Sequence, residues 1–295
     1  MTVGILFLMA LCVYLSALLG FALLTYAFFW YETFNGPHLD RLRQRSQNRV
    51  AGWILRGIVT SFVSQNLTVL CYPLRFWRKL WEPHPDTSCP HPPIILIHGL
   101  FHNVSAWILY RYVLRRNGFR NIYAFGYGSL NTSFQEILNK LDRKVQAVGR
   151  VFPGQRLVLI GHSLGGLLVR AYAEDPHNTH RIAAAVTLGA PHQGSKLAAL
   201  GSLKLARSLC YRGKLLAALE PEDEPPDIPR LAVYSPIDNM VLPNESCQVA
   251  HAGWTHQECQ PLSHLAMLYH VPLVRLVSDY LQRHASAQLQ ERAGD

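Results

Sequence analysis

The five residues from Gly161 to Gly165, with the sequence GHSLG, constrain the fold of this 295-residue chain more than any other segment. The segment before them, Arg156 to Ile160, is short and apolar, as expected of a strand that is buried on both faces. The segment after them, Leu167 to Ala173, has a helical pattern. Small residues let a chain turn sharply from a strand into a helix and present the serine above the sheet edge. The sequence therefore predicts a strand–turn–helix unit with Ser163 at its tip.

Short apolar runs of the same kind recur along the chain. They predict strands at Ile94–Ile97, Ile182–Leu188 and Leu231–Tyr234, and a further strand around Cys247 to His251. A helix is predicted from Ser133 to Arg150. Strands that alternate with helices form a mostly parallel sheet with helices on both faces, so the predicted fold class is α/β.

The N-terminal segment, Met1 to Tyr31, contains no charged side chain. It exceeds the roughly 20 apolar residues that cross a bilayer core, and its aromatic C-terminal end suits a membrane–water interface. A cleaved signal peptide would instead begin with basic residues and end with small ones. We therefore favour a transmembrane anchor over residues 1–31.

Residues 32–91 form a basic membrane-proximal region. Its helical pattern between residues 51 and 72 has three interpretations: a helix packed on the domain, a helix in the membrane interface, or a second crossing. A second crossing would place Arg56 at mid-bilayer, where a charge is expensive. The proline-rich stretch from Trp81 to Pro93 cannot continue a helix, so we expect a linker there and the main domain at 92–285, an α/β fold.

The formal net charge is +9, and the basic residues cluster after the apolar segment, beginning with Arg41, Arg43, Arg45 and Arg49. No nucleic-acid recognition motif accompanies them, so we expect no nucleic-acid partner. These basic residues are better explained as a signal that sets the orientation of the chain in the membrane and as a site of attraction to anionic lipid headgroups. With one crossing they place the domain in the cytoplasm; with two crossings it lies outside, which a Cys247–Cys259 disulfide would support.

A serine hydroxyl such as that of Ser163 becomes a good nucleophile only when a base takes its proton and a third group orients the base. Asp238 follows the strand that ends at Tyr234, and site residues gather at the C-terminal ends of parallel strands. We therefore favour Asp238 as the acid. Competing acids lie too early in the chain or in a proline-rich acidic run: Asp175, Glu220, Glu222, Asp223, Glu224 and Asp227.

His264, at the entrance to an apolar helix, is the favoured base, and His256 is the main alternative, with His251 and His270 also present. The oxyanion needs two preorganised donors. One is expected from Leu164, the residue after the nucleophile. The other is expected from the loop after Ile94–Ile97, where Gly99 allows a close approach; Leu100 is favoured and Phe101 is the alternative.

The chain resembles the bacterial lipase and esterase branch of the α/β-hydrolase superfamily over residues 92 to about 275. The resemblance implies a triad of Ser163, Asp238 and His264, with the Leu100 and Leu164 N–H groups as oxyanion donors, and no metal or organic cofactor. The matching segments are Ile94–Leu100, GHSLGG (161–166), LGAPHQGS (188–195), SPIDNMVLP (235–243) and SHLAML (263–268).

Residues 196–220 are expected to form a helix pair with leucines flanked by cations. This segment is either a lid that opens toward a lipid surface or a cover for the core of the domain. With the anchor, it favours acyl esters presented at a membrane: phospholipid, lysophospholipid or glyceride.

The expected function is a membrane-anchored serine esterase or lipase, single-pass in the bacterial inner membrane, with the side of the catalytic domain and the oligomeric state left open. The alternatives are an acyltransferase or thioesterase with the same triad, and a catalytically silent interaction module. The sequence by itself does not separate hydrolysis from transfer to an alcohol, because both use the same residues.

Overall fold

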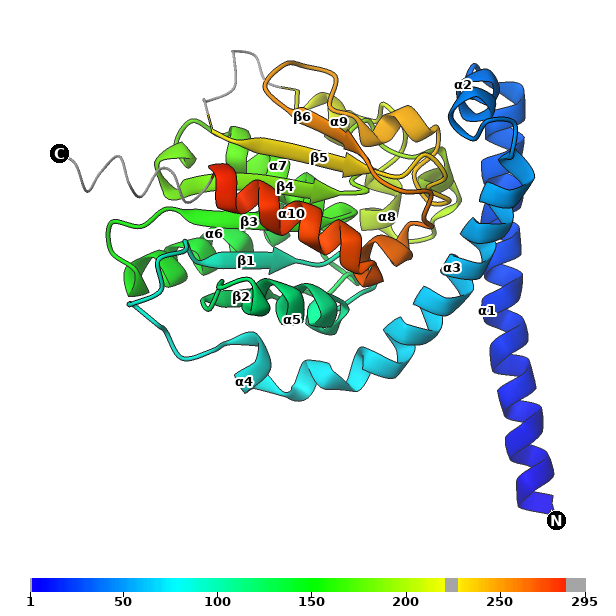
Figure 1. The fold of residues 1–295 in the computed structure, drawn as a ribbon, viewed down its shortest axis with the longest axis horizontal. Helices are drawn as coiled ribbons and strands as arrows, with labels where there is room; N and C mark the ends of the chain where they lie inside the picture. The colour runs from blue at the N-terminus through cyan, green and yellow to red at the C-terminus, as the bar shows by residue number, and fades with distance from the viewer. Residues whose placement is uncertain (1, 221–227, 285–295) are drawn as a thin grey trace.

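The computed structural model describes residues 2–220 and 228–284, so the predicted domain end at residue 285 lies outside the described residues. Its centre is a six-stranded sheet in the order β2-β1-β3-β4-β5-β6, and every neighbouring pair is parallel (Figure 1). The strands are β1 (Ile94–Ile97), β2 (Ile122–Phe125), β3 (Leu157–His162), β4 (Ile182–Leu188), β5 (Arg230–Tyr234) and β6 (Thr255–Glu258).

Two hydrophobic cores lie on the two faces of the sheet. Ile94 and Leu96 of β1 face the core that holds α5 (Ile108–Arg116) and α10 (Val271–His284). Ile95 and Ile97 face the core that holds α6 (Phe134–Val151) and α7 (Leu164–Glu174). Because alternate residues of the strand are buried on opposite faces, its sequence is a continuous apolar run.

The predicted strands at β1, β3, β4 and β5 are confirmed to within two residues. The prediction of a strand around Cys247 to His251 is wrong: a 3₁₀ helix, Asn244–Cys247, lies at its start, and the last strand that the structure describes is β6. Most of the β6 side chains are polar and exposed at the sheet edge, so they carry no hydrophobic signal. The short β2 strand was not predicted.

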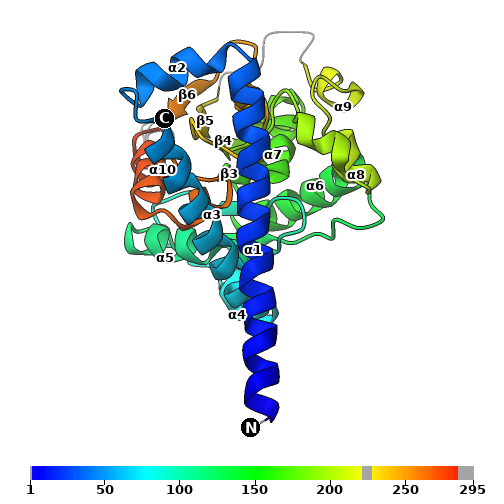
Figure 2. The same ribbon diagram turned by 90° about the vertical axis from the view of Figure 1, so that its right-hand side faces the viewer.

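The N-terminal region consists of helices that run along one side of the domain (Figures 1 and 2). The long helix α1 (Thr2–Asn35) extends four residues beyond the predicted anchor, and its N-terminal part projects past the domain in both views. The C-terminal part packs on the domain, where Tyr26 and Phe29 are buried. The elements are α1 (Thr2–Asn35), α2 (His38–Arg45), α3 (Val50–Cys71), a 3₁₀ helix η1 (Tyr72–Phe76) and α4 (Arg78–Trp81).

Two helical stretches, Val3–Asn35 and Val50–Phe76, are long and apolar enough to cross a membrane. The α3 helix within the second stretch buries small and polar residues and exposes apolar ones, which is the reverse of the usual pattern in a soluble protein. It buries Gly57, Ser61, Ser64 and Gln65, and it exposes Leu55, Val59, Val63 and Leu70. The Arg56 Nη2 donates to Gln260 Oε1 at 3.2 Å, so this charge is directed to the domain. One face of α3 therefore packs on the protein, and its apolar face is exposed.

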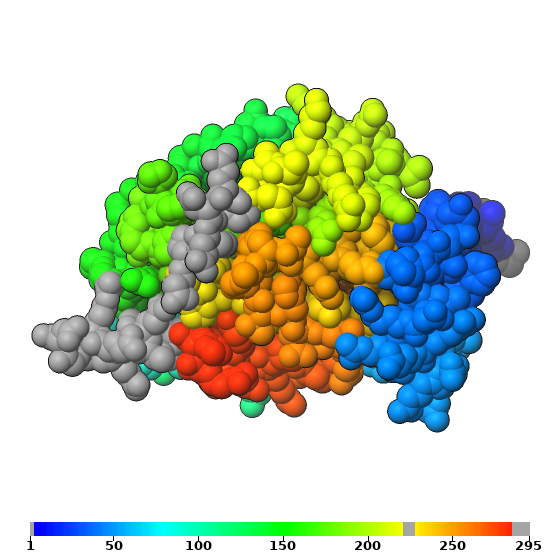
Figure 3. Space-filling view, turned by 90° about the horizontal axis from the view of Figure 1, so that it is seen from above, coloured from blue at the N-terminus to red at the C-terminus, as the bar shows by residue number. Residues whose placement is uncertain are grey.

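The segment at 196–220 forms three short helices rather than the expected pair: η4 (Lys196–Leu200), α8 (Lys204–Ser208) and α9 (Lys214–Ala217). Its buried leucines, Leu205, Leu209 and Leu216, belong to the core of the domain, whereas Leu200 is exposed. Figure 3 shows this yellow-green segment beside the blue N-terminal helices, and an ion pair joins Lys196 Nζ to Glu32 Oε1 of α1 at 2.6 Å.

Candidate active site

Ser163 lies at the turn between β3 and α7, as the GHSLG motif predicts. Its φ of 56° places a residue with a side chain in the left-handed region, which is uncommon and strained. The surroundings hold this conformation: the Ser163 N–H donates to Leu188 O at 2.9 Å, and its carbonyl accepts the Gly166 N–H at 2.9 Å. The strained turn raises the hydroxyl above the end of the sheet.

The glycines around Ser163 are required by backbone contacts. A Cβ at Gly161 would overlap the carbonyl of Gly165, and a Cβ at Gly165 would overlap the carbonyl of Ile97. Strand β3, the turn and strand β1 thus approach one another more closely than side chains permit. This explains physically why the motif has glycine two residues before and two residues after the serine.

Asp238 and His264 form a buried pair. The His264 Nδ1–H donates to Asp238 Oδ2 at 2.7 Å, and Asp238 is fully buried. Its other oxygen, Oδ1, accepts the N–H groups of Met240 and Val241 at 2.8 and 3.0 Å. Because the carboxylate is held from both sides, it orients the imidazole and leaves the His264 Nε2 lone pair available as a base.

Ser163 and His264 line one cavity of about 470 Å³. Most of its wall is apolar, and the 196–220 segment contributes Leu197, Leu200 and Leu209. The N-terminal helices also contribute to the wall, through Phe21 of α1 and Ser61 of α3. The segment that the sequence suggested as a lid therefore lies over the cavity and also packs into the core.

The loop after β1 passes close to the serine, since a Cβ at Gly99 would lie 3.0 Å from Ser163 Cβ. Of the two predicted donors in this loop, the Phe101 N–H already donates to Ser129 Oγ at 2.9 Å. This hydrogen bond favours Leu100 as the oxyanion donor. Leu164 is the first residue of α7, where N–H groups have no acceptor within the helix.

His162 contacts the predicted base on the side opposite Asp238, and this contact was not predicted from the sequence. Its Nε2–H donates to the carbonyl oxygen of His264 at 3.1 Å, and the two ring centroids are 4.6 Å apart. Burial, together with the neighbouring His264 and His102, lowers the pKa of His162 well below its usual range. A neutral His162 therefore holds the backbone of His264 without adding a second positive charge.

The N-terminal helix α1 reaches the loop that carries Asp238. Asn239 links the two: its Oδ1 accepts the His264 N–H at 3.0 Å, and its Nδ2 donates to Thr25 Oγ1 at 2.7 Å. On the other side of Asp238, the Tyr26 hydroxyl donates to the Ile237 carbonyl at 2.9 Å. Two consecutive residues of α1 therefore brace both neighbours of the acid.

Helix α3 makes a similar contact on the histidine side. The N–H of Ser263, which precedes His264, donates to Thr60 Oγ1 at 3.2 Å. These supporting residues were not predicted, because short-range sequence patterns contain no information on a contact between residues more than 200 positions apart. The sequence feature that could have indicated these contacts is the presence of polar residues, such as Thr25 and Thr60, within apolar helices.

Two of the rival histidines, His256 and His251, have other partners. His256 lies on the edge strand β6, and its Nε2 accepts the Val249 N–H at 3.0 Å. The His251 Nε2 lies 3.1 Å from a carboxylate oxygen of Glu174. The structure brings Asp238 to His264 and places neither of these two histidines in the wall of the serine cavity.

The rival acids are also engaged elsewhere where the structure describes them. Glu220 pairs with Arg170 at 3.0 Å, and Asp175 accepts N–H groups in its own turn. The remaining competitors, Glu222, Asp223, Glu224 and Asp227, lie outside the described residues. Cys247 and Cys259, whose pairing would have borne on topology, are both free thiols.

A sequence profile of the alpha/beta hydrolase family matches residues 94–292. The chain therefore belongs to this family, as the motifs predicted. A curated relative, the probable esterase PIR7A of rice (Oryza sativa), is 39% identical over 104 residues. That match covers 32% of this chain and 38% of the rice protein, so the chain matches well under half of the relative's length.

Solved structures share the fold. The mature lipase BlEst2 of Bacillus licheniformis superposes with a TM-score of 0.57 at 18% identity, covering 68% of this chain and 94% of that one. Lipase B of Aspergillus fumigatus gives 0.60 at 14% identity, covering 69% and 55%. A monoacylglycerol lipase of Paleococcus ferrophilus gives 0.51 at 20% identity, covering 66% and 96%. These similarities confirm the predicted α/β-hydrolase fold.

Proposed function

We propose that this protein is a membrane-anchored serine esterase or lipase with Ser163 as nucleophile, His264 as base and Asp238 as orienting acid. The observation that carries the proposal is the buried 2.7 Å hydrogen bond between His264 and Asp238, because the same histidine lines the cavity that Ser163 lines. The esterase and lipase names of the relatives support carboxylic esters as the substrates.

The geometry supports acyl transfer in two steps. Ser163 Oγ attacks the ester carbonyl carbon while its proton passes to His264 Nε2, and Asp238 stabilises the imidazolium. The N–H groups of Leu100 and Leu164 donate hydrogen bonds to the carbonyl oxygen and stabilise the negative charge that develops on it. His264 then protonates the departing alkoxide, and the acyl-enzyme is hydrolysed by water that gives its proton to the same histidine.

The cavity favours an acyl chain over a small polar acid. Its volume of about 470 Å³ suits an organic ligand, and most of its wall is apolar, with three leucines from the 196–220 segment. Burying an apolar chain against such a wall is favourable by roughly 0.8 kcal/mol for each methylene. A long acyl ester therefore gains binding energy that a short ester does not.

The N-terminal helices support anchoring in a membrane. Helix α1 meets the length and hydropathy requirement, and α3 turns its polar face to the protein and its apolar face outward. A cleaved signal sequence would meet the same requirement as α1. The contacts of Thr25 and Tyr26 with the loop of the acid favour an α1 that is retained, because cleavage would remove them.

The test is labelling of the detergent-purified full chain with a fluorescent fluorophosphonate, which reacts only with an activated serine. We expect the wild type to label, and Ser163→Ala and His264→Ala to lose labelling. His256→Ala is the matched control and should label like the wild type, since His256 lies on β6. A folded wild type that neither labels nor hydrolyses p-nitrophenyl esters would contradict the proposal and favour an interaction module.

A further inference from the structure

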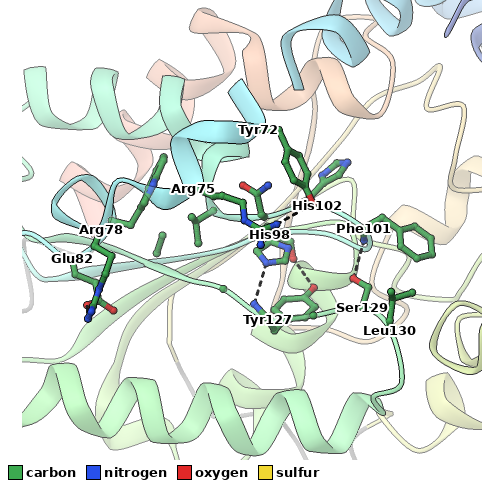
Figure 4. A pocket seen from close by; sticks show the side chains of 16 residues that line it. Tyr72, Arg75, Arg78, Glu82, His98, Phe101, His102, Tyr127, Ser129 and Leu130 are labelled. Carbon is green, nitrogen blue, oxygen red and sulfur yellow. Dashed lines mark hydrogen bonds and ion pairs between the residues drawn. The ribbon is translucent and has the colours of Figure 1, made fainter. Parts of the chain in front are cut away.

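A second cavity, of about 730 Å³, is shown in Figure 4. It adjoins the serine cavity, since Phe101 and His102 line both. One side of the second cavity is formed by the chain from Tyr72 to Glu82, which includes η1 and α4. The other side is formed by the loops after β1 and β2. Unlike the serine cavity, it is lined by charged side chains, which are Arg75, Arg78 and Glu82.

Arg75 is the cation that is available to a ligand. Its Nη1 donates to the Tyr72 hydroxyl at 3.3 Å, and its guanidinium lies over the rings of Tyr72 and Phe76. Among the described residues no carboxylate pairs with Arg75, whereas Arg78 pairs with Glu82 at 3.5 Å. In Figure 4 the Arg75–Tyr72 pair lies toward the His98 and His102 end of the cavity, and Arg78 and Glu82 lie toward the other end.

Two buried polar atoms near this end also lack a partner in the described part of the chain: His102 Nδ1 and Asn103 Nδ2. Both residues line the cavity. Burial, with smaller contributions from His98 and His264, lowers the pKa of His102 to about 3, so its ring is neutral at ordinary pH. Buried polar groups are normally hydrogen-bonded, so these atoms point to a polar ligand.

The donors correspond to one class of ligand. A guanidinium binds phosphate oxygens through charge-assisted hydrogen bonds, and neutral hydroxyl, amide and imidazole N–H groups complete such sites. The cavity also lies at the C-terminal end of α3, beside Phe76 and Trp77, which are 76% and 63% exposed. Exposed aromatic side chains next to cations are typical of a protein surface at the level of lipid headgroups.

We propose that this second cavity binds the phosphate of an acyl phospholipid while the acyl ester lies in the serine cavity, on the other side of Phe101 and His102. The proposal rests on the esterase function and narrows its substrates to phosphate-bearing acyl lipids. Arg75 is its specificity-determining residue. A neutral glyceride has the same esters but leaves the Arg75 guanidinium and the donors beside it without a ligand.

The first experiment measures binding without turnover. Ser163→Ala is titrated calorimetrically with dihexanoyl phosphatidylglycerol kept below its micellar concentration, so that the charge of a lipid surface does not contribute. Adding Arg75→Gln should weaken binding about tenfold or more, the usual effect of losing a hydrogen bond to a charged group. Adding Lys79→Gln removes an equal charge from a neighbouring exposed residue outside the cavity lining and should leave binding unchanged.

The second experiment measures turnover by the full chain with Ser163 intact. Dihexanoyl phosphatidylglycerol should have a kcat/KM about tenfold above that of dihexanoylglycerol, and Arg75→Gln should remove this preference mainly through KM. Hydrolysis of p-nitrophenyl butyrate should not change in Arg75→Gln. This ester has no phosphate, so its hydrolysis tests the esterase proposal separately from the proposed phosphate site. If the enzyme hydrolyses it but does not prefer the phospholipid, the phosphate site alone is overturned.

In the binding experiment, three results overturn the proposal. The first is phospholipid binding to Ser163→Ala that does not change in Arg75→Gln. The second is an equal loss in Arg75→Gln and Lys79→Gln, which would mean attraction by overall charge. The third is binding of sn-glycerol 3-phosphate or inorganic phosphate as tightly as the phospholipid, which would make the ligand a free phosphate. The binding results stand whether or not the serine labels, so they test the cavity separately from the catalytic proposal.

Discussion

Asp238 uses both carboxylate oxygens, one for the His264 Nδ1–H and one for the N–H groups of Met240 and Val241. The second set of hydrogen bonds fixes the carboxylate plane, so the first can hold the imidazole in one tautomer. His162 acts on the same residue from the other side, through the His264 carbonyl. At the scale of single residues, the predicted base is held at both its ring and its backbone.

Asp238→Asn tests this arrangement. The amide keeps the size of the side chain but cannot stabilise an imidazolium, and its NH₂ group favours the wrong tautomer. We expect kcat for p-nitrophenyl butyrate to fall by roughly 10⁴-fold, with little change in KM. Asp175→Asn, in the turn after α7, is the control and should retain activity. A kcat within tenfold of wild type for a folded Asp238→Asn would exclude Asp238 as the orienting acid.

At the scale of secondary-structure elements, the exposure of α1 and its contacts with the domain differ along its length. Its N-terminal part, from residue 3 to residue 20, is mostly exposed, whereas Thr25 and Tyr26 contact the loop around Asp238. Helix α3 adds the Thr60 contact to Ser263. The helices that we propose as the membrane region therefore also contact the loops that carry Asp238 and His264, so the proposed anchor forms part of the proposed active site.

Thr25→Val tests the support from α1. Valine has the shape of threonine but leaves the Asn239 Nδ2 without its acceptor, which costs about 1–3 kcal/mol in a buried site. We expect kcat to fall about tenfold with KM unchanged, because Asn239 also holds the His264 N–H. Thr25→Ser should restore the rate.

The control for this variant is Ser16→Val, which changes an exposed position on the same helix. It should have no effect on kcat. A loss of protein stability in Thr25→Val that leaves kcat at the wild-type value would show that Thr25 has only a structural role. Equal losses of kcat in Thr25→Val and Ser16→Val would indicate an effect of the helix as a whole rather than of the Asn239 contact.

At the scale of the whole molecule, buried histidines couple stability to pH. The His98 Nε2 accepts the Tyr127 N–H at 3.2 Å, and its Nδ1–H donates to Gly99 O at 2.8 Å. Burial lowers the pKa of His98 to about 4, although the hydrogen bond to Gly99 acts in the opposite direction. The unfolded histidine has a pKa of about 6.5.

Between pH 6.5 and pH 4 the unfolded state therefore binds a proton that the folded state does not. Above pH 6.5 His98 has no effect, and as pH falls toward 4 it removes about 1.4 kcal/mol of stability per pH unit. We expect the free energy of unfolding in urea to decrease between pH 7.5 and pH 5, and His98→Gln to reduce that decrease by about 2 kcal/mol. Identical decreases in both proteins would contradict a neutral, buried His98.

The sequence alone determined the features that depend on neighbours in the chain. The strands β1, β3, β4 and β5 were predicted because a strand buried on both faces must be apolar at every position. The turn at Ser163 was predicted because its glycines lie where the backbone leaves no room for a Cβ. The candidates Ser163, Asp238 and His264 were predicted from short local motifs, chosen to fit the order of serine, acid and histidine that the fold requires.

Only the tertiary structure decided the features that depend on distant contacts. The edge strand β6 has polar, exposed residues, and its pairing with β5 supplies the hydrogen bonds that its sequence does not signal. Thr25 meets Asn239 across 214 residues, and the second cavity forms only where η1 lies against the loops after β1 and β2. Local patterns record which residues are buried; the packing of elements decides which residues meet.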